Sequence, residues 1–234
     1  MIGFYTLFEF LASKVRFYGL MYALSFLLIN KLVAIKLHKY DSTKINNVMF
    51  DVFLGLIVGG RLGYILAYDT ENIFNFYEIM AIWKGGMAAY GGFVIGIIVL
   101  YWRTKAVSIP LKDFTDALAT FLPIGLFLGR LANLVNGEIV GKYMSEHCAY
   151  RHPVSVYNML FEGVFISCVM LWKNKYRIKL SETSLFLFWY GMSRLILDYF
   201  REENDLLYHF TYGQLLGIIF IFISIVMILQ ERKS

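Results

Sequence analysis

Three arginines stand inside stretches of the sequence that are otherwise apolar: Arg61, Arg130 and Arg194. An arginine at the centre of a lipid bilayer costs about 2.5–3.5 kcal/mol on insertion scales, so such residues are candidates for binding or catalysis. A guanidinium matches a phosphate group through two parallel hydrogen bonds and keeps its proton. The three arginines therefore predict a site for a phosphate-bearing ligand. For any one of them, a structural ion pair or a side chain that reaches to the membrane surface is the alternative.

The third arginine belongs to a series of polar residues at helical spacing. The series is Tyr190, Arg194, Asp198 and Arg201, at positions i, i+4, i+8 and i+11. In a helix this spacing puts all four on one face. Asp198 is one turn from each arginine, so it is expected to pair with either of them.

The composition indicates that the elements that position these residues are membrane helices. Of 234 residues, 59% are hydrophobic and 17% are charged, whereas soluble domains average about 25% charged residues. A soluble fold could not cover this much apolar surface. Seven stretches approach the length of about 20 residues that a spanning helix needs. We therefore predict a single all-α domain, 1–234, with seven transmembrane helices near 17–36, 47–68, 82–102, 114–135, 153–172, 183–200 and 211–229.

The distribution of positive charge predicts the orientation of these spans. Thirteen lysines and arginines fall in the connections 31–44, 103–112 and 173–179 and in the tail 232–233, against six in the connections on the other side. Because lysine and arginine accumulate on the cytoplasmic side, the N-terminus is predicted outside and the C-terminus in the cytoplasm. In this topology all three intramembrane arginines lie in the outer half of the bilayer.

Two tyrosines and several glycines are predicted at the same depth. Tyr18 and Tyr90 each lie early in a span that enters from outside. Gly85–Gly86 and Gly91–Gly92 bracket Tyr90, which suggests an irregular entry into that span. Small residues four apart, as in 55–63, favour close packing of helices. From these residues alone, the sequence predicts a protein that binds an anionic lipid from the outer leaflet.

Other seven-helix functions fit the sequence less well. The stretch 211–229 contains no lysine for a retinal Schiff base, which argues against a light-driven pump or sensor. No internal repeat of the kind that many transporters carry is evident. No cysteine or histidine spacing typical of a metal site is present, so no metal is expected.

One segment carries a more specific signal. Residues 129–141, GRLANLVNGEIVG, resemble the signature of the prolipoprotein diacylglyceryl transferase family. Shorter matches occur in the same order along the chain, so the resemblance covers about residues 20–200. They are FYGLMY at 17–22, GRLGY at 60–64, GGM at 85–87, GG at 91–92, RHP at 151–153, and Tyr190 and Gly191 through Arg194 to Phe200 and Arg201.

The resemblance implies an enzyme that moves the diacylglyceryl group of phosphatidylglycerol onto the lipobox cysteine of a preprolipoprotein and releases glycerol phosphate. It implies that Arg130 holds the lipid head group and that Arg194 stabilises the leaving phosphate or the attacking thiolate. Asn133, Asn136 and Glu138 would orient the glycerol. Further residues are expected in the same cavity: Tyr18, Arg61, Gly141, Tyr190, Asp198 and Arg201. The implied location is the bacterial plasma (inner) membrane, with the site on the outer side, no cofactor and no nucleic-acid partner.

The chain departs from the family pattern at functionally important places. Tyr90 stands where the family has a histidine that is commonly proposed as the base, and an unperturbed tyrosine titrates near pH 10. Either the arginine-rich field lowers the pKa of Tyr90 or of the thiol, or the histidine is not essential, or the reaction has changed. The last case leaves a paralogue with another thiol acceptor, or a catalytically silent lipid-binding protein. Asp198 replaces a glutamate, and the short connection 141–151 suggests a different mode of acceptor recognition.

Overall fold

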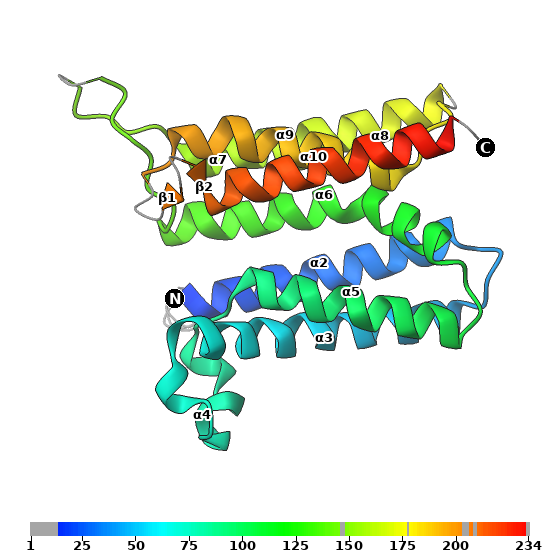
Figure 1. The fold of residues 1–234 in the computed structure, drawn as a ribbon, viewed down its shortest axis with the longest axis horizontal. Coiled ribbons are helices and arrows are strands. Elements are labelled where there is room, and N and C mark those ends of the chain that lie inside the picture. The colour runs from blue at the N-terminus through cyan, green and yellow to red at the C-terminus, as the bar shows by residue number, and fades with distance from the viewer. Residues whose placement is uncertain (1–13, 146–147, 177, 203–205, 208–209, 233–234) are drawn as a thin grey trace, which may run out of the picture. The chain divides into compact units, whose positions relative to one another are not determined.

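The computed structural model describes residues 14–145, 148–176, 178–202, 206–207 and 210–232, which are almost entirely helical (Figure 1). Arg177 and Lys233, two of the charges used to predict the orientation, lie outside these residues. The elements are α2 (Lys14–Lys36), α3 (Ser42–Tyr68), η1 (Thr70–Asn72), α4 (Phe76–Met80), η2 (Ile82–Lys84), α5 (Ala89–Ala106), α6 (Leu111–Asn136), α7 (Val154–Asn158), η3 (Met159–Phe165), α8 (Ile166–Lys175), α9 (Glu182–Leu197), η4 (Asp198–Phe200), β1 (Leu206–Leu207), β2 (Phe210–Thr211) and α10 (Tyr212–Glu231).

Five helical stretches among the described residues are long and apolar enough to cross a membrane. They are Phe17–Lys36, Ser42–Tyr68, Leu111–Asn136, Val154–Lys175 and Tyr212–Glu231. The prediction of an integral membrane protein built from helices is thereby confirmed. The third apolar stretch forms a helix only from Ala89 onward, because Gly85 and Gly86 adopt positive φ angles of 83° and 74° that end the preceding turn.

The chain divides into two compact units, which are described separately. Of the described residues, the first contains those up to 19 and 26–114, and the second contains 20–25 and those from 115 onward. Within the first unit, α2 contacts α3 through Phe26 and Phe53, whose rings stack with centroids 4.5 Å apart.

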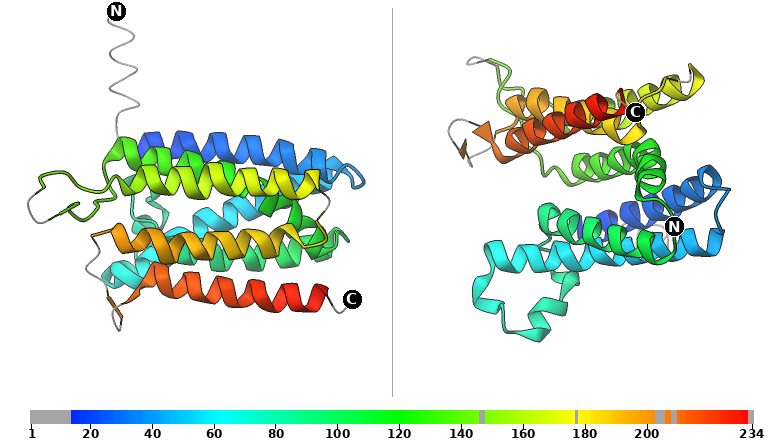
Figure 2. Two further views of the ribbon diagram at one scale, coloured as in Figure 1. Left: turned by 90° about the horizontal axis from the view of Figure 1, so that it is seen from above. Right: turned by 45° about the vertical axis from the view of Figure 1, so that its right-hand side comes forward.

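Helices α3 and α5 of the first unit pack backbone against backbone (Figure 2). A Cβ atom added to Gly59 would lie 2.4 Å from the carbonyl oxygen of Gly91, and one added to Gly63 would lie 2.8 Å from the Cα of Gly91. Real side chains essentially never approach so closely, so only glycine fits at these positions. The close packing predicted from the glycine spacing is confirmed here.

A polar cluster joins the connection after α2 to the start of α6. The Asp113 carboxylate lies 2.7 Å from Nζ of Lys39 and accepts a hydrogen bond of 2.6 Å from the hydroxyl of Tyr40. Because this carboxylate favours the protonated forms of both neighbours, it raises the pKa of Lys39 and of Tyr40. The cluster fixes the course of the chain between these two helices.

In the second unit, α9 and α10 run side by side (Figure 1). They approach closely at Gly191 and Gly217, where an added Cβ on either residue would lie within 2.7 Å of the other's carbonyl oxygen. Helix α10 begins at a capping box: Gln214 N donates to Oγ1 of Thr211, and Thr211 N donates to the Gln214 side chain. The strands β1 and β2 form a short antiparallel hairpin immediately before it.

Candidate active site

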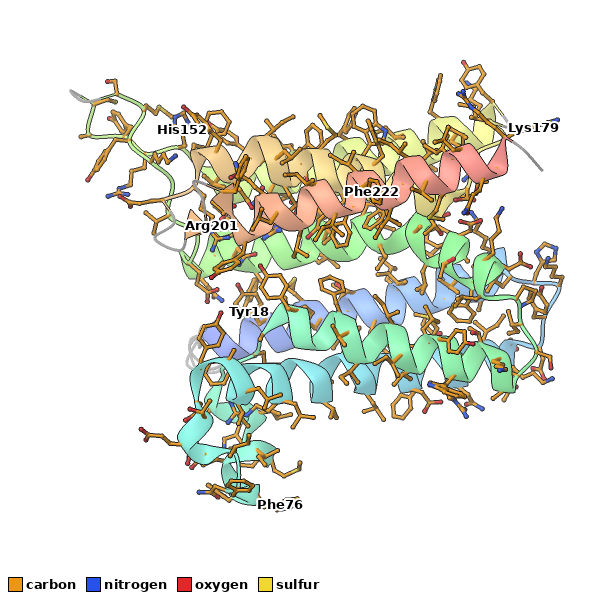
Figure 3. The ribbon with its side chains drawn as sticks, in the orientation of Figure 1. Tyr18, Phe76, His152, Lys179, Arg201 and Phe222 are labelled. Carbon is orange, nitrogen blue, oxygen red and sulfur yellow. The ribbon has the colours of Figure 1, made fainter. Side chains whose placement is uncertain are left out.

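Several of the predicted site residues lie at one end of the second unit. In Figure 3, Arg201 and His152 lie at this end, and Lys179 lies at the opposite end. The C-terminus of α6, the connection from 137 to 153, the end of α9 with η4, and the start of α10 all meet here. Nine of the twelve site residues predicted from the sequence belong to this unit: Arg130, Asn133, Asn136, Glu138, Gly141, Tyr190, Arg194, Asp198 and Arg201.

A buried carboxylate joins the two principal arginines. Arg130 donates from Nε to Oε2 of Glu162 over 2.7 Å, and Arg194 donates from Nη2 to Oε1 over 2.5 Å. The Glu162 side chain is fully buried, whereas those of Arg130 and Arg194 are 15% and 10% exposed. The Nε of Arg194 has no hydrogen-bond partner among the described residues. The arrangement presents two fixed guanidiniums, from α6 and α9, around a single anion.

Asp198 extends this network to α10. Its Oδ1 lies 3.5 Å from Nη1 of Arg194, which confirms the predicted pairing one helical turn apart. Its Oδ2 accepts from the Thr211 hydroxyl at 3.5 Å, and a Cβ added to Gly213 would lie only 1.9 Å from the same oxygen. The carboxylate therefore lies against the first turn of α10, where the helix dipole favours negative charge.

The segment that follows α6 folds back on itself. Gly137 takes a positive φ of 65° and ends the helix. The Glu138 backbone N–H then donates to the carbonyl of Asn133 at 3.3 Å, and the Asn136 side-chain amide donates to Oε1 of Glu138 at 3.2 Å. The structure therefore brings together the three residues that were expected to orient the glycerol.

Gly141 and Arg201 belong to one backbone framework. They form an antiparallel bridge, and Arg201 N donates to the carbonyl of Asp198 at 3.2 Å. A Cβ at Gly141 would lie 2.0 Å from the carbonyl oxygen of His152, so this position accommodates only glycine. The signature segment is in this way fixed to the end of α9.

Aromatic rings lie beside Arg194. The Tyr190 ring stacks on Phe186 with centroids 5.6 Å apart, and the Arg194 guanidinium lies 5.6 Å from the centroid of Tyr190. The attraction between the cation and the ring adds a further constraint on Arg194.

An apolar groove of about 450 Å³ lies in the same unit. It is lined by Tyr157, Leu160, Phe161, Phe165, Leu197 and Phe200. Two of these rings, Tyr157 and Phe200, also contact His152, whose Nδ1 is 3.3 Å from the Tyr157 hydroxyl. Leu197, one of the residues that line the groove, directly precedes Asp198 in the sequence.

The other three predicted site residues, Tyr18, Arg61 and Tyr90, belong to the first unit. Arg61 is buried and donates to three backbone carbonyls: Nη2 to Glu78 at 2.6 Å, and Nη1 to Gly85 at 2.7 Å and Gly86 at 3.1 Å. Its guanidinium thus fixes the irregular segment that precedes α5. Tyr90 is the second residue of α5 and is about half exposed. Tyr18 lies early in α2, at the place marked in Figure 3.

Glu162 is the residue that the sequence analysis missed. Its signal is present in the sequence, because it is a carboxylate within the apolar stretch 153–172. Searching the predicted spans for acidic residues as well as for arginines would have found it, since a buried charge normally has a charged partner. Within the described ranges, no group of three or more histidine, cysteine or acidic side chains is arranged to hold a metal ion.

Fold and site together define a helical membrane protein in which two arginines from different helices are held on one buried carboxylate. The family model described as prolipoprotein diacylglyceryl transferase matches residues 5–230, so the chain belongs to that family. Similar proteins include the phosphatidylglycerol–prolipoprotein diacylglyceryl transferases of Coxiella burnetii (strain RSA 331 / Henzerling II) and Wigglesworthia glossinidia brevipalpis. The first is 34% identical over 86% of this chain and 83% of its own length. The second is 29% identical over 93% and 92%.

Proposed function

We propose that this protein transfers the diacylglyceryl group of phosphatidylglycerol to the cysteine thiol of a prolipoprotein lipobox. The observation that carries the proposal is the pair of arginines, Arg130 and Arg194, held around one buried carboxylate in a chain of this family. A phosphodiester head group is the anion that a membrane supplies at this depth. The names of the relatives include phosphatidylglycerol and prolipoprotein.

The reaction that we propose is a substitution at the carbon of the diacylglyceryl group that carries the phosphate ester. The thiolate sulfur forms a bond to this carbon, the carbon–oxygen bond to the phosphate breaks, and glycerol phosphate departs with the electron pair. The thiol proton passes to a base. The protein must therefore position the carbon, deprotonate the thiol and stabilise the growing charge on the phosphate.

We assign the two arginines different roles towards the phosphate. Arg130 is the more exposed, and Glu162 engages its Nε, so we assign it to the incoming head group. Arg194 is more deeply buried, and its Nε has no acceptor among the described residues. We assign it to the charge that develops as the phosphate leaves, where a fixed donor in a dry site is most effective.

The remaining residues position the substrates. The folded segment that contains Asn133, Asn136 and Glu138 is proposed to orient the glycerol, with Gly141 at its end. Tyr190 borders Arg194, and Asp198 and Arg201 hold the end of α9. Tyr18, Arg61 and Tyr90 remain candidates from the first unit, with Tyr90 as the proposed proton acceptor at the family's histidine position.

We also propose the predicted topology of seven spans with the N-terminus outside. The helices α5 and α9 would add two shorter spans, of 18 and 16 residues, to the five long ones. The distribution of lysine and arginine supports a site in the outer half of the bacterial plasma membrane. There it would have access to phospholipid and to an acceptor that has crossed the membrane.

The experiment is to incubate purified protein with phosphatidylglycerol and a synthetic lipobox peptide. Glycerol phosphate release and the mass of the peptide are followed together. We expect the peptide to gain one diacylglyceryl group for each glycerol phosphate released. Arg130→Ala should abolish transfer, whereas Arg103→Ala, which removes an arginine paired with Asp51 in the first unit, should leave it intact.

The other outcomes identify the alternatives. Glycerol phosphate release without peptide modification would indicate hydrolysis or another acceptor. Lipid binding without any release would indicate a silent lipid-binding protein. Retained transfer in Arg130→Ala would remove the proposed head-group contact.

A further inference from the structure

The local structure around Glu162 is unusual for a membrane helix. Glu162 lies in η3, a seven-residue π-helical segment between α7 and α8. Such segments are rare and occur frequently at functional sites. The side chain is fully buried, and Oε1 also accepts a hydrogen bond of 3.2 Å from the hydroxyl of Ser193. The wide turn therefore orients a charged group into the interior of the second unit.

Close packing of η3 on α6 fixes the position of this carboxylate along α6. A Cβ added to Gly163 would lie 2.6 Å from the Cβ of Phe127 and 3.0 Å from its Cα. Phe127 precedes Arg130 by three residues, so the glycine contact lies about one helical turn from the Arg130–Glu162 ion pair. The contact holds the two partners at hydrogen-bond distance.

Glu162 also offsets the repulsion between the two arginines. Two guanidiniums held near each other in a dry interior repel strongly, because the effective dielectric constant there is low. Each oxygen of Glu162 accepts from one guanidinium, and the carboxylate lowers their joint charge from two to one. Asp198 is less closely engaged, since its Oδ1 is 3.5 Å from Nη1 of Arg194 whereas Oε1 of Glu162 is 2.5 Å from Nη2.

We propose that Glu162 is a positioning residue that sets the spacing of Arg130 and Arg194 and limits their charge, so that the site favours a singly charged phosphodiester over a doubly charged phosphomonoester. The proposal rests on the function proposed above. Phosphatidylglycerol carries one phosphate charge, whereas glycerol phosphate carries nearly two at neutral pH, as other phosphomonoesters do. Glu162 would thus favour binding of the substrate and release of the product.

The test compares Glu162→Gln and Glu162→Asp with the unchanged protein. Glu162→Gln keeps the size of the side chain and removes its charge. We expect kcat to fall on the order of 100-fold, because the arginines lose their common anchor. We expect the affinity for glycerol phosphate relative to phosphatidylglycerol to rise on the order of tenfold, because one additional positive charge acts on the second phosphate charge. Glu162→Asp restores the charge and should return the affinity ratio to that of the unchanged protein.

Glu202→Gln is the matched control, since Glu202 is an exposed carboxylate that pairs with Arg151 outside the buried network. It should change neither kcat nor the affinity ratio. An unchanged ratio in Glu162→Gln, with both ligands bound more weakly in equal proportion, would overturn the proposal and leave a purely structural role. If Glu162→Gln does not fold, Glu162→Asp still tests the proposal, because an affinity ratio displaced towards glycerol phosphate although the charge is kept would contradict it.

Failure of this inference differs from failure of the proposed function. If the unchanged protein does not transfer the lipid group, the proposed function is wrong. The binding ratio for phosphatidylglycerol and glycerol phosphate still tests the role of Glu162 in that case.

Discussion

Gly163→Ala should separate α6 from η3 and lower the rate of transfer without touching any substrate. The added Cβ would lie 2.6 Å from the Cβ of Phe127, and carbon atoms pack at about 3.5–4.0 Å, so the two segments must move apart by roughly 1 Å. Because Arg130 Nε and Glu162 Oε2 are 2.7 Å apart, a shift of this size breaks their hydrogen bond.

Both activity and stability should respond to this change. A misplacement of about 1 Å in a catalytic group can reduce the rate on the order of 100-fold. Overpacking of a close contact typically lowers the free energy of unfolding by about 1–3 kcal/mol. The assay is the initial rate of peptide modification at saturating phosphatidylglycerol, with the thermal midpoint measured on the same preparation.

The matched control is a substitution at the next residue that also adds one CH2 group. Val164 is 44% exposed, so Val164→Ile adds a methylene group on the exposed face and should leave kcat unchanged. The reasoning would be refuted if folded Gly163→Ala had a kcat within about threefold of that of Val164→Ile, well short of the expected 100-fold loss.

Three further predictions concern other parts of the chain. Arg61→Lys should speed hydrogen exchange of the amides in 78–88, because an ammonium cannot make the three carbonyl contacts of the guanidinium; exchange no faster than in Arg103→Lys would contradict this. Gly191→Ala should lower the free energy of unfolding by about 1–3 kcal/mol, since its Cβ would lie 2.6 Å from the Gly217 carbonyl oxygen; an unchanged thermal midpoint would show that α9 and α10 separate without cost. Tyr90→Phe should lower kcat on the order of 100-fold if the phenol moves the proton, whereas Tyr90→His should retain transfer; a fully active Tyr90→Phe enzyme would exclude Tyr90 as the proton acceptor.

The helical architecture was largely predictable from local sequence. Long apolar stretches give long helices whatever their neighbours are, because the backbone in lipid must satisfy its own hydrogen bonds. The late start of α5 was less predictable: the glycine pair indicated an irregular entry, but only the conformations of Gly85 and Gly86 locate the first helical residue at Ala89. The close packing of Gly59 and Gly63 on α5 followed from their spacing.

The site was predictable in part. The helical spacing of Arg194 and Asp198 predicted their ion pair, because residues four apart on a helix are neighbours. The partners of Arg61 were not predictable, since the carbonyls that it binds belong to the short helix α4 and to the glycine pair after η2, in the connection between α3 and α5. Its role as an anchor for that segment depends on the course of the backbone.

The sequence by itself determined that this protein is a membrane protein of a lipid-transferase family with arginines inside its spans, because composition, charge distribution and the segment 129–141 are local properties of the chain. Only the tertiary structure decided that Glu162 stands between Arg130 and Arg194. These three residues come from different helices: Glu162 is 32 positions from Arg130 and 32 positions from Arg194 in the sequence. No local spacing encodes such a contact, since it arises from how the helices pack.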